Sequence, residues 1–242
     1  TGAAVTAVLV LDRPHTTGAH EAMPVGAGAF ASRRNAKLAA AVEAEAEAVL
    51  AAAREAAGDL AFDVVRREEA PEPALLAECA AHDLVVIGRD STLGREQADD
   101  GLSPTIEALI RDGARPLLVV PPGTSPTAGL VLVGYDGSLP AMRTLQLFAL
   151  LGLAGGAPVK LLDFSQGTPA ALLRYLERHG LAAEGVVAEG DAHDILLAEA
   201  RSLPARLLVL GADEESGVAR LIFGSASARL LRAAPCPVFI HG

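Results

Sequence analysis

The chain repeats part of itself, and this repeat constrains the fold more than any other feature. Three segments recur about 120 residues later, which indicates an internal duplication. The matched pairs are residues 75–78 with 196–199, residues 83–88 with 206–211, and residues 114–120 with 235–240. A stretch rich in Pro, Gly, Ser and Thr, residues 121–128, joins the copies. We therefore expect two domains, residues 1–122 and 129–242.

The second copy alternates between apolar runs of strand length and segments with helical spacing. The expected strands are residues 130–135, 159–164, 183–188, 207–210 and 238–240, and the expected helices are residues 141–153, 169–179, 191–201 and 225–233. Apolar and polar residues do not alternate strictly along these runs, which is typical of parallel strands buried on both faces. The sequence thus predicts an α/β fold in which each copy forms an open parallel sheet flanked by helices.

The first copy has no counterpart of the second copy's opening strand and helix. Its residues 2–5 align with residues 156–159, just before the second strand of the unit. We expect either a truncated or disordered start of about 28 residues or a strand borrowed from elsewhere, because a parallel sheet without this unit exposes one side. A long loop, residues 12–30, precedes an Ala/Glu-rich helix, residues 32–57, whose glutamates we expect to face solvent, with a partner-binding surface as the alternative.

Composition excludes several classes of function. The net charge of -10 argues against a nucleic-acid partner, because such interfaces need clustered Lys and Arg. The most apolar stretch, residues 145–162, is interrupted by glycines and a lysine, so we expect no membrane span. Cys79 and Cys236 lie far apart in apolar segments, which favours two buried free thiols. These features together predict a cytoplasmic protein.

One loop of the second copy has the pattern of a phosphate-binding site. Gly211 follows the apolar run of residues 207–210, and Gly224 and Ser225 stand where the next helix is expected to begin. Glycines allow backbone N–H groups to approach an anion, and the first turn of a helix offers unpaired N–H groups and the positive end of its dipole. Plain turn chemistry without a ligand is the alternative explanation of the two glycines.

These residues resemble the universal stress protein family. The family signature is a Gly-x-x-Gly loop, nine further residues and Gly-Ser or Gly-Thr, followed by a helix and a Pro-x-Pro-Val strand. Gly211 and Gly224 have the family spacing, Ser225 is in place, and residues 235–238 read Pro-Cys-Pro-Val. The turn at residues 136–138, Asp-Gly-Ser after an apolar strand, is similar to the family's first turn. The resemblance covers the whole second copy and, more loosely, the first, and members with two tandem domains are common.

The resemblance implies a Rossmann-like, five-stranded parallel sheet in each domain, with ATP or AMP at the carboxyl ends of the strands. Asp136 would lie near the ribose or a Mg²⁺-bound phosphate, Gly134 and Phe164 would border the adenine, and the backbone after Gly224 would hold phosphate oxygens. The positions that the resemblance assigns to the nucleotide are Gly134, Asp136, Phe164, Leu210, Gly211, Gly224, Ser225 and Ala226.

The resemblance also implies how the two copies associate. Domains of this family often pair through their last strands, placed antiparallel. Here this implies residues 117–120 against residues 238–241 within one chain, with a pseudo-twofold relation between the copies and a homodimer as a further possibility. No Ser/His/Asp constellation has catalytic spacing, so we expect at most slow ATP hydrolysis.

Glu214 departs from the family pattern, because it stands where the loop has its second glycine. A carboxylate about 6 Å from a phosphate, at an effective dielectric near 20, costs roughly 3 kcal/mol, which corresponds to about a hundredfold in affinity. Mg²⁺ or Arg220 could offset part of this repulsion. The alternative function is therefore a tandem scaffold that binds protein partners and no nucleotide.

Two other patterns have plainer interpretations than ligand binding. The sequence Asp191-x-His193-Asp194 could hold a metal, but a helix start capped by Asp191 explains it more simply. In the first copy, Ser103 and Pro104 stand at the Gly-Ser positions, and proline has no N–H to donate to a phosphate. We therefore expect no nucleotide in the first copy.

Overall fold

The structure is a computed structural model, and it describes residues 2–11, 28–90, 102–124, 128–165, 167, 169–212 and 230–242, with the backbone alone at residues 28–32. The described residues form two compact units, one up to Ala77 and one from Glu78 onward. These bounds differ from those of the two sequence copies, because the later strands of the first copy pair with strands of the second. The division into domains 1–122 and 129–242 stays a prediction.

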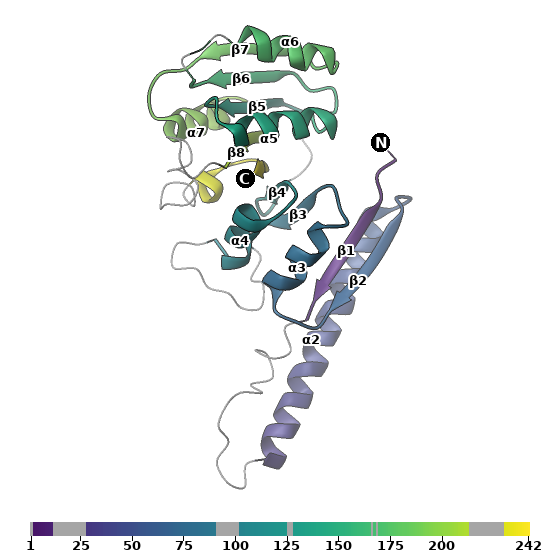
Figure 1. The fold of residues 1–242 in the computed structure, drawn as a ribbon. Helices are drawn as coiled ribbons and strands as arrows, with labels where there is room; N and C mark the ends of the chain where they lie inside the picture. The colour runs from purple at the N-terminus through teal and green to yellow at the C-terminus, as the bar shows by residue number, and fades with distance from the viewer. Residues whose placement is uncertain are drawn as a thin grey trace. The chain divides into compact units, whose positions relative to one another are not determined.

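The first unit is a parallel strand pair with its crossover helix (Figure 1). Its elements are β1 (Val5–Val10), α2 (Gly28–Ala57) and β2 (Phe62–Arg67). Val5 lies opposite Phe62, and the register continues to the ends of both strands. Arg66 of β2 forms ion pairs with Glu43 and with Glu47 of α2, the latter at 3.0 Å. Two of the glutamates expected to face solvent therefore contact the strand, at a surface site where such pairs stabilise little.

The second unit contains a seven-stranded sheet in the order β3-β4-β9-β8-β5-β6-β7 (Figure 1). Its strands are β3 (Val85–Gly88), β4 (Leu117–Val120), β5 (Leu130–Tyr135), β6 (Val159–Asp163), β7 (Ala183–Val187), β8 (Ala205–Gly211) and β9 (Val238–His241). The described helices after β2 are α3 (Pro71–Cys79), α4 (Pro104–Asp112), α5 (Leu139–Leu150), α6 (Ala170–Arg178) and α7 (Ala192–Ser202). All neighbouring strands are parallel except β4 and β9.

The antiparallel pairing of β4 with β9 confirms the expected contact between residues 117–120 and 238–241. Leu118 lies opposite Phe239, and Leu117 lies opposite Ile240. Since Leu118 and Phe239 are also equivalent in the repeat, a local twofold axis passes through this pair. This pairing makes β3 and β4 continuous with the five strands of the second copy in one sheet.

The second copy folds as its apolar pattern predicts, with an open parallel sheet in the order β9-β8-β5-β6-β7. Ser138 caps α5 by accepting a hydrogen bond from the N–H of Ala141, and Gly180 ends α6 with a φ of +74°. Helices α5 and α6 share one buried cluster with Val131, Val133 and other odd-numbered positions of β5. Helix α7 covers the opposite face, where Leu196 lies over β5.

Gly211 allows α5 to pack closely on the end of β8. A Cβ at Gly211 would lie 2.7 Å from the carbonyl carbon of Pro140 and closer still to the backbone of Ala141. Backbone atoms cannot move aside as a flexible side chain can, so the first turn of α5 requires glycine at this position.

We therefore predict that Gly211→Ala destabilises the protein by about 3 kcal/mol through overpacking against α5. The matched control is Gly180→Ala, where a Cβ meets nothing within 4 Å and the cost comes from the positive φ alone, about 1 kcal/mol. Urea unfolding followed by circular dichroism measures both. Equal losses in the two variants would contradict the close approach of α5 to Gly211.

Candidate functional site

The candidate site lies where the parallel strands β5, β6 and β8 end. Strand β5 has β6 on one side and β8 on the other, and the chain leaves β5 and β6 toward helices on the same face. Gly134 lies beside Leu162 of β6 and Leu210 of β8 in the register. In open α/β sheets, a crevice forms at the carboxyl edge where neighbouring strands run to opposite sides, and ligands bind there.

The turn after β5 is held by its own polar side chains. Asp136 accepts a hydrogen bond from the N–H of Ser138 at 3.0 Å, and Gly137 adopts a φ of +84°. Asp136 is partly exposed at the carboxyl edge. A carboxylate at this place could accept hydrogen bonds from ribose hydroxyls or bind a hard cation.

The turn after β6 lies next to it and contains a buried carboxylate that the sequence analysis missed. Phe164 donates its N–H to the carbonyl of Tyr135 at 2.7 Å, which joins the two turns. Asp163 is 1% exposed, and its Oδ1 accepts hydrogen bonds from the N–H (2.9 Å) and the hydroxyl (2.5 Å) of Ser165. The Asp-x-Ser sequence after an apolar strand was the signal that could have revealed this turn.

Negative charge gathers at this edge of the sheet. Burial raises the pKa of Tyr135, and the nearby carboxylates of Asp163 and Asp136 raise it further. A phenol whose pKa is raised stays protonated and can donate a hydrogen bond at neutral pH. The arrangement favours a ligand that offers hydroxyl donors or arrives with a cation.

The two glycines of the site have packing roles of their own. A Cβ at Gly134 would lie 2.8 Å from the side chain of Leu210 and 2.9 Å from that of Leu196, so this glycine makes room for the core beneath α7. Gly211 makes room for α5 as described above. Glycine at these two positions is therefore explained without a ligand.

The structure brings five of the eight assigned positions to one edge of the sheet. These are Gly134, Asp136, Phe164, Leu210 and Gly211. The other three, Gly224, Ser225 and Ala226, lie outside the described residues, as does Glu214.

Two other sequence patterns, at Asp191 and at Ser103, form helix caps in the structure. Asp191 caps α7 by accepting a hydrogen bond from the N–H of Asp194 at 3.0 Å, which confirms the helix-start interpretation. Side-chain atoms of Asp191, His193 and Asp194 do lie within 4.8 Å of one another. Ser103 caps α4 by accepting from the N–H of Ile106.

Both cysteines are buried free thiols, as predicted. Burial raises the pKa of Cys236 to about 11, so this thiol stays protonated at neutral pH. Burial also raises the pKa of Cys79. Among the described helices, none combines the length and apolar character that crossing a membrane requires.

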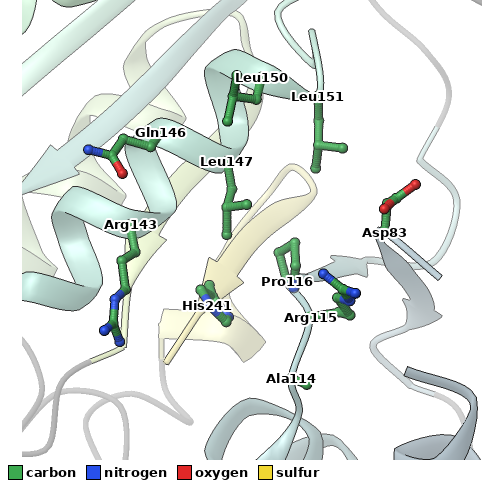
Figure 2. A pocket seen from close by; sticks show the side chains of 10 residues that line it. All are labelled: Asp83, Ala114, Arg115, Pro116, Arg143, Gln146, Leu147, Leu150, Leu151 and His241. Atoms are coloured by element: carbon green, nitrogen blue, oxygen red, sulfur yellow. The ribbon is translucent and has the colours of Figure 1, made fainter. Parts of the chain in front are cut away.

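A hollow of about 340 Å³ lies between α5 and the starts of β3 and β4 (Figure 2). Leu147 and Leu150 of α5 line it on one side, and Pro116 lies on the other. His241 also lines it, with an Nδ1 that is buried and has no hydrogen-bond partner in the described part of the chain. Arg143 lies near the ring, so the hollow has a positive side.

The parallel order, the helices on both faces and the two joined turns define a doubly wound α/β protein. Comparison with known proteins names the family within this class. Residues 166–241 match the model of the universal stress protein family. Universal stress protein Slr1230 from Synechocystis sp. is 27% identical over 164 residues, which are 64% of this chain and 56% of that protein. The second copy thus matches the universal stress protein family over residues 166–241, and the similarity spans little more than half of this curated relative.

One solved structure of this family agrees with the fold over nearly the whole chain. A universal stress protein from Archaeoglobus fulgidus has a TM-score of 0.64 and 18% identity, covering 98% of this chain and 95% of that chain. A universal stress protein family protein from Arabidopsis thaliana, solved with AMP bound, has a TM-score of 0.36 and 15% identity, covering 47% of this chain and 90% of that chain.

The electrostatic environment of His241 gives a testable pKa. Burial lowers the pKa of His241 from 6.5, and the charges of Arg143 and Arg115 lower it further. We predict that Arg143→Gln raises this pKa toward 6.5, as measured by NMR titration of the ring, whereas Arg178→Gln on α6 leaves it unchanged.

The same shift has a consequence for stability. Because the folded pKa lies below the unfolded value, the contribution of His241 is present above about pH 6.5 and is lost as the pH falls through the folded pKa. A titration midpoint of His241 that does not respond to Arg143→Gln would contradict the placement of this arginine.

Proposed function

We propose that residues 129–242 bind an adenine nucleotide, ATP or AMP, and that the protein acts in a stress response through this site. The observation that supports this most is the convergence of Gly134, Asp136, Phe164, Leu210 and Gly211 at the carboxyl ends of β5, β6 and β8. These residues are up to 77 positions apart in the sequence, and only the parallel topology brings them to one edge.

The chemistry of the described residues suits such a ligand. Phe164 is half-buried at the carboxyl edge and offers an apolar ring for a purine. Asp136 keeps a carboxylate at the turn that can accept hydrogen bonds from ribose hydroxyls. Gly224, Ser225 and Ala226 would then hold phosphate oxygens at the start of the last helix.

Mg²⁺ would accompany a triphosphate at this site. Asp136 is the residue that would hold it, and its oxygen donor matches the preference of this cation. The ion would neutralise phosphate charge beside Asp136 and Glu214. No catalytic constellation was found in the sequence, so hydrolysis at this site would be slow.

The alternative function is a scaffold that binds protein partners without a nucleotide. The packing roles of Gly134 and Gly211 favour it, because they account for both glycines without a phosphate. The acidic residue at position 214 favours it as well, since it opposes an anionic ligand.

Calorimetry with ATP and Mg²⁺ on the purified 242-residue chain separates the two functions. We expect a dissociation constant in the micromolar range, and we expect Asp136→Asn and Gly224→Asp each to weaken binding at least tenfold. Asp59→Asn, an exposed turn residue of the other unit, is the matched control and should bind as the parent chain does. If no heat of binding is measured up to millimolar ATP or AMP, the nucleotide proposal is refuted and the scaffold function is favoured.

The charge of Glu214 can be tested separately from its size. We predict that Glu214→Gln strengthens ATP binding by up to about a hundredfold because the repulsion of roughly 3 kcal/mol disappears. Glu214→Gly should add a further gain if the side chain also obstructs the phosphates. Calorimetry at low and high salt measures both variants, and a gain from Glu214→Gln that does not shrink at high salt would argue against an electrostatic cause.

A further inference from the structure

The hollow in Figure 2 combines an apolar wall with a positive side. All the residues that line it belong to the second unit, so the cavity is a property of that unit alone. Its volume of about 340 Å³ is at the lower end of the range for small-molecule sites. None of the five described positions assigned to the nucleotide is among the residues that line it.

Helix α5 supplies the apolar wall of the hollow. Leu147 and Leu150 lie one helical turn apart, and both line the cavity. Leu150 is 69% exposed, whereas Phe148 on the same helix is fully buried in the core. Pro116, just ahead of β4, lies across the cavity from these leucines. An apolar group placed in the hollow would remove this exposed surface from water, which favours binding.

Two arginines give the hollow its positive side. Arg143 belongs to α5 and Arg115 to the segment ahead of β4, and both line the cavity. Burial lowers the pKa of His241 most, and the charges of Arg143 and Arg115 lower it further. Both guanidinium groups therefore act on the same ring, which lies between them in Figure 2.

The positive charge of the hollow is not neutralised by the described residues. Within the part of the chain that the structure describes, neither Arg143 nor Arg115 forms an ion pair. The Nε of Arg115 donates to the carbonyl of Cys79 at 3.3 Å, an uncharged partner. Asp83 is the one carboxylate among the described lining residues. Two cations thus face one anion in a chain whose net charge is -10.

His241 adds unused hydrogen-bonding capacity to the positive side. Its Nδ1 is buried and has no hydrogen-bond partner in the described part of the chain. Buried polar atoms nearly always have a partner, and one without a partner calls for an explanation such as a missing water or ligand. An unpaired nitrogen beside a cavity with two arginines is what a site for a polar, anionic group has before that group binds.

We propose that this hollow binds a small organic acid, with its carboxylate held by Arg143 and Arg115 and its apolar chain laid along Leu147 and Leu150. A guanidinium pairs with a carboxylate through two parallel hydrogen bonds, which fixes the acid's head group. An inorganic anion leaves the apolar wall uncovered, and a neutral apolar molecule leaves the arginines unpaired. The ligand therefore needs both parts. The proposal does not depend on nucleotide binding.

Octanoate tests the proposal, because it joins a carboxylate to a short apolar chain. We expect the 242-residue chain to bind it at low salt with a sub-millimolar dissociation constant, measured by calorimetry. Acetate carries the charge without the chain, and octanol carries the chain without the charge. Each of these two compounds should bind at least tenfold more weakly than octanoate.

The ring of His241 reports where the carboxylate lies. Bound octanoate should raise the pKa of His241, measured by NMR titration of the ring, because its charge offsets those of Arg143 and Arg115. Octanol should leave this pKa unchanged. Asp83, the carboxylate that already lines the hollow, is present with either compound and so cannot cause the difference.

Two substitutions on α5 separate the two halves of the site. Arg143→Gln should weaken octanoate binding at least tenfold through the lost charge-assisted hydrogen bonds, and Leu150→Gln should weaken it about tenfold through the lost apolar contact. Both side chains are exposed, so neither variant should disturb folding. The matched controls, Arg178→Gln on α6 and Leu139→Gln on α5, change exposed residues that do not line the hollow and should bind as the parent chain does.

Several results would overturn the proposal. Octanoate that does not bind at millimolar concentration, or binds no more tightly than octanol, would do so. Binding that neither Arg143→Gln nor Leu150→Gln weakens would place the ligand elsewhere. A 242-residue chain that is dimeric by light scattering and becomes monomeric through Leu150→Gln would also overturn it, since a second copy would then occupy the hollow.

Discussion

The antiparallel pairing of β4 with β9 is the interaction on which the rest of the structure depends. Leu118 and Phe239 face each other across it, and they are equivalent in the repeat. A contact between equivalent residues places β4 and β9 about a local twofold axis, as in an isologous dimer interface built within one chain. Because backbone hydrogen bonds make this contact, it joins β3 and β4 to the strands of the second copy in one sheet.

Helix α5 connects this interface to the candidate site. Its Phe148 packs on Phe239 next to the local axis, while its first turn packs on Gly211 at the carboxyl edge. Thr144, between them, donates its hydroxyl hydrogen to the carbonyls of Pro140 and His241. A rigid helix held at both ends fixes the Asp136 turn relative to the sheet, so packing of the core and geometry of the candidate site depend on the same element.

The sequence predicted what arises from local pattern. The strand spans of the second copy and the Asp191 cap are of this kind, since apolar runs and capping chemistry specify them. The pairing of β4 with β9 was implied only by the resemblance to the universal stress protein family. The sequence did not predict that Asp163 is buried. A carboxylate at the end of a strand is usually expected in a solvent-exposed turn, and only the strand register shows that Asp163 lies beside Tyr135. The packing roles of Gly134 and Gly211 were not predicted either. They depend on contacts with Leu196 and with helix α5, which are distant from these glycines in the sequence.

The charges at the carboxyl edge determine what kind of nucleotide complex the site could form. Asp136 and Asp163 lie at the ends of adjacent strands, and Tyr135 between them has its pKa raised partly by their charges. An added triphosphate brings further negative charge, whereas the adenosine part of a nucleotide offers hydroxyl donors that carboxylates accept. The carboxylates at this edge would therefore repel mainly the phosphates of a nucleotide. For the nucleotide complex proposed above, affinity for ATP should thus depend on Mg²⁺ more strongly than affinity for AMP, because the cation would screen the phosphates from the acids.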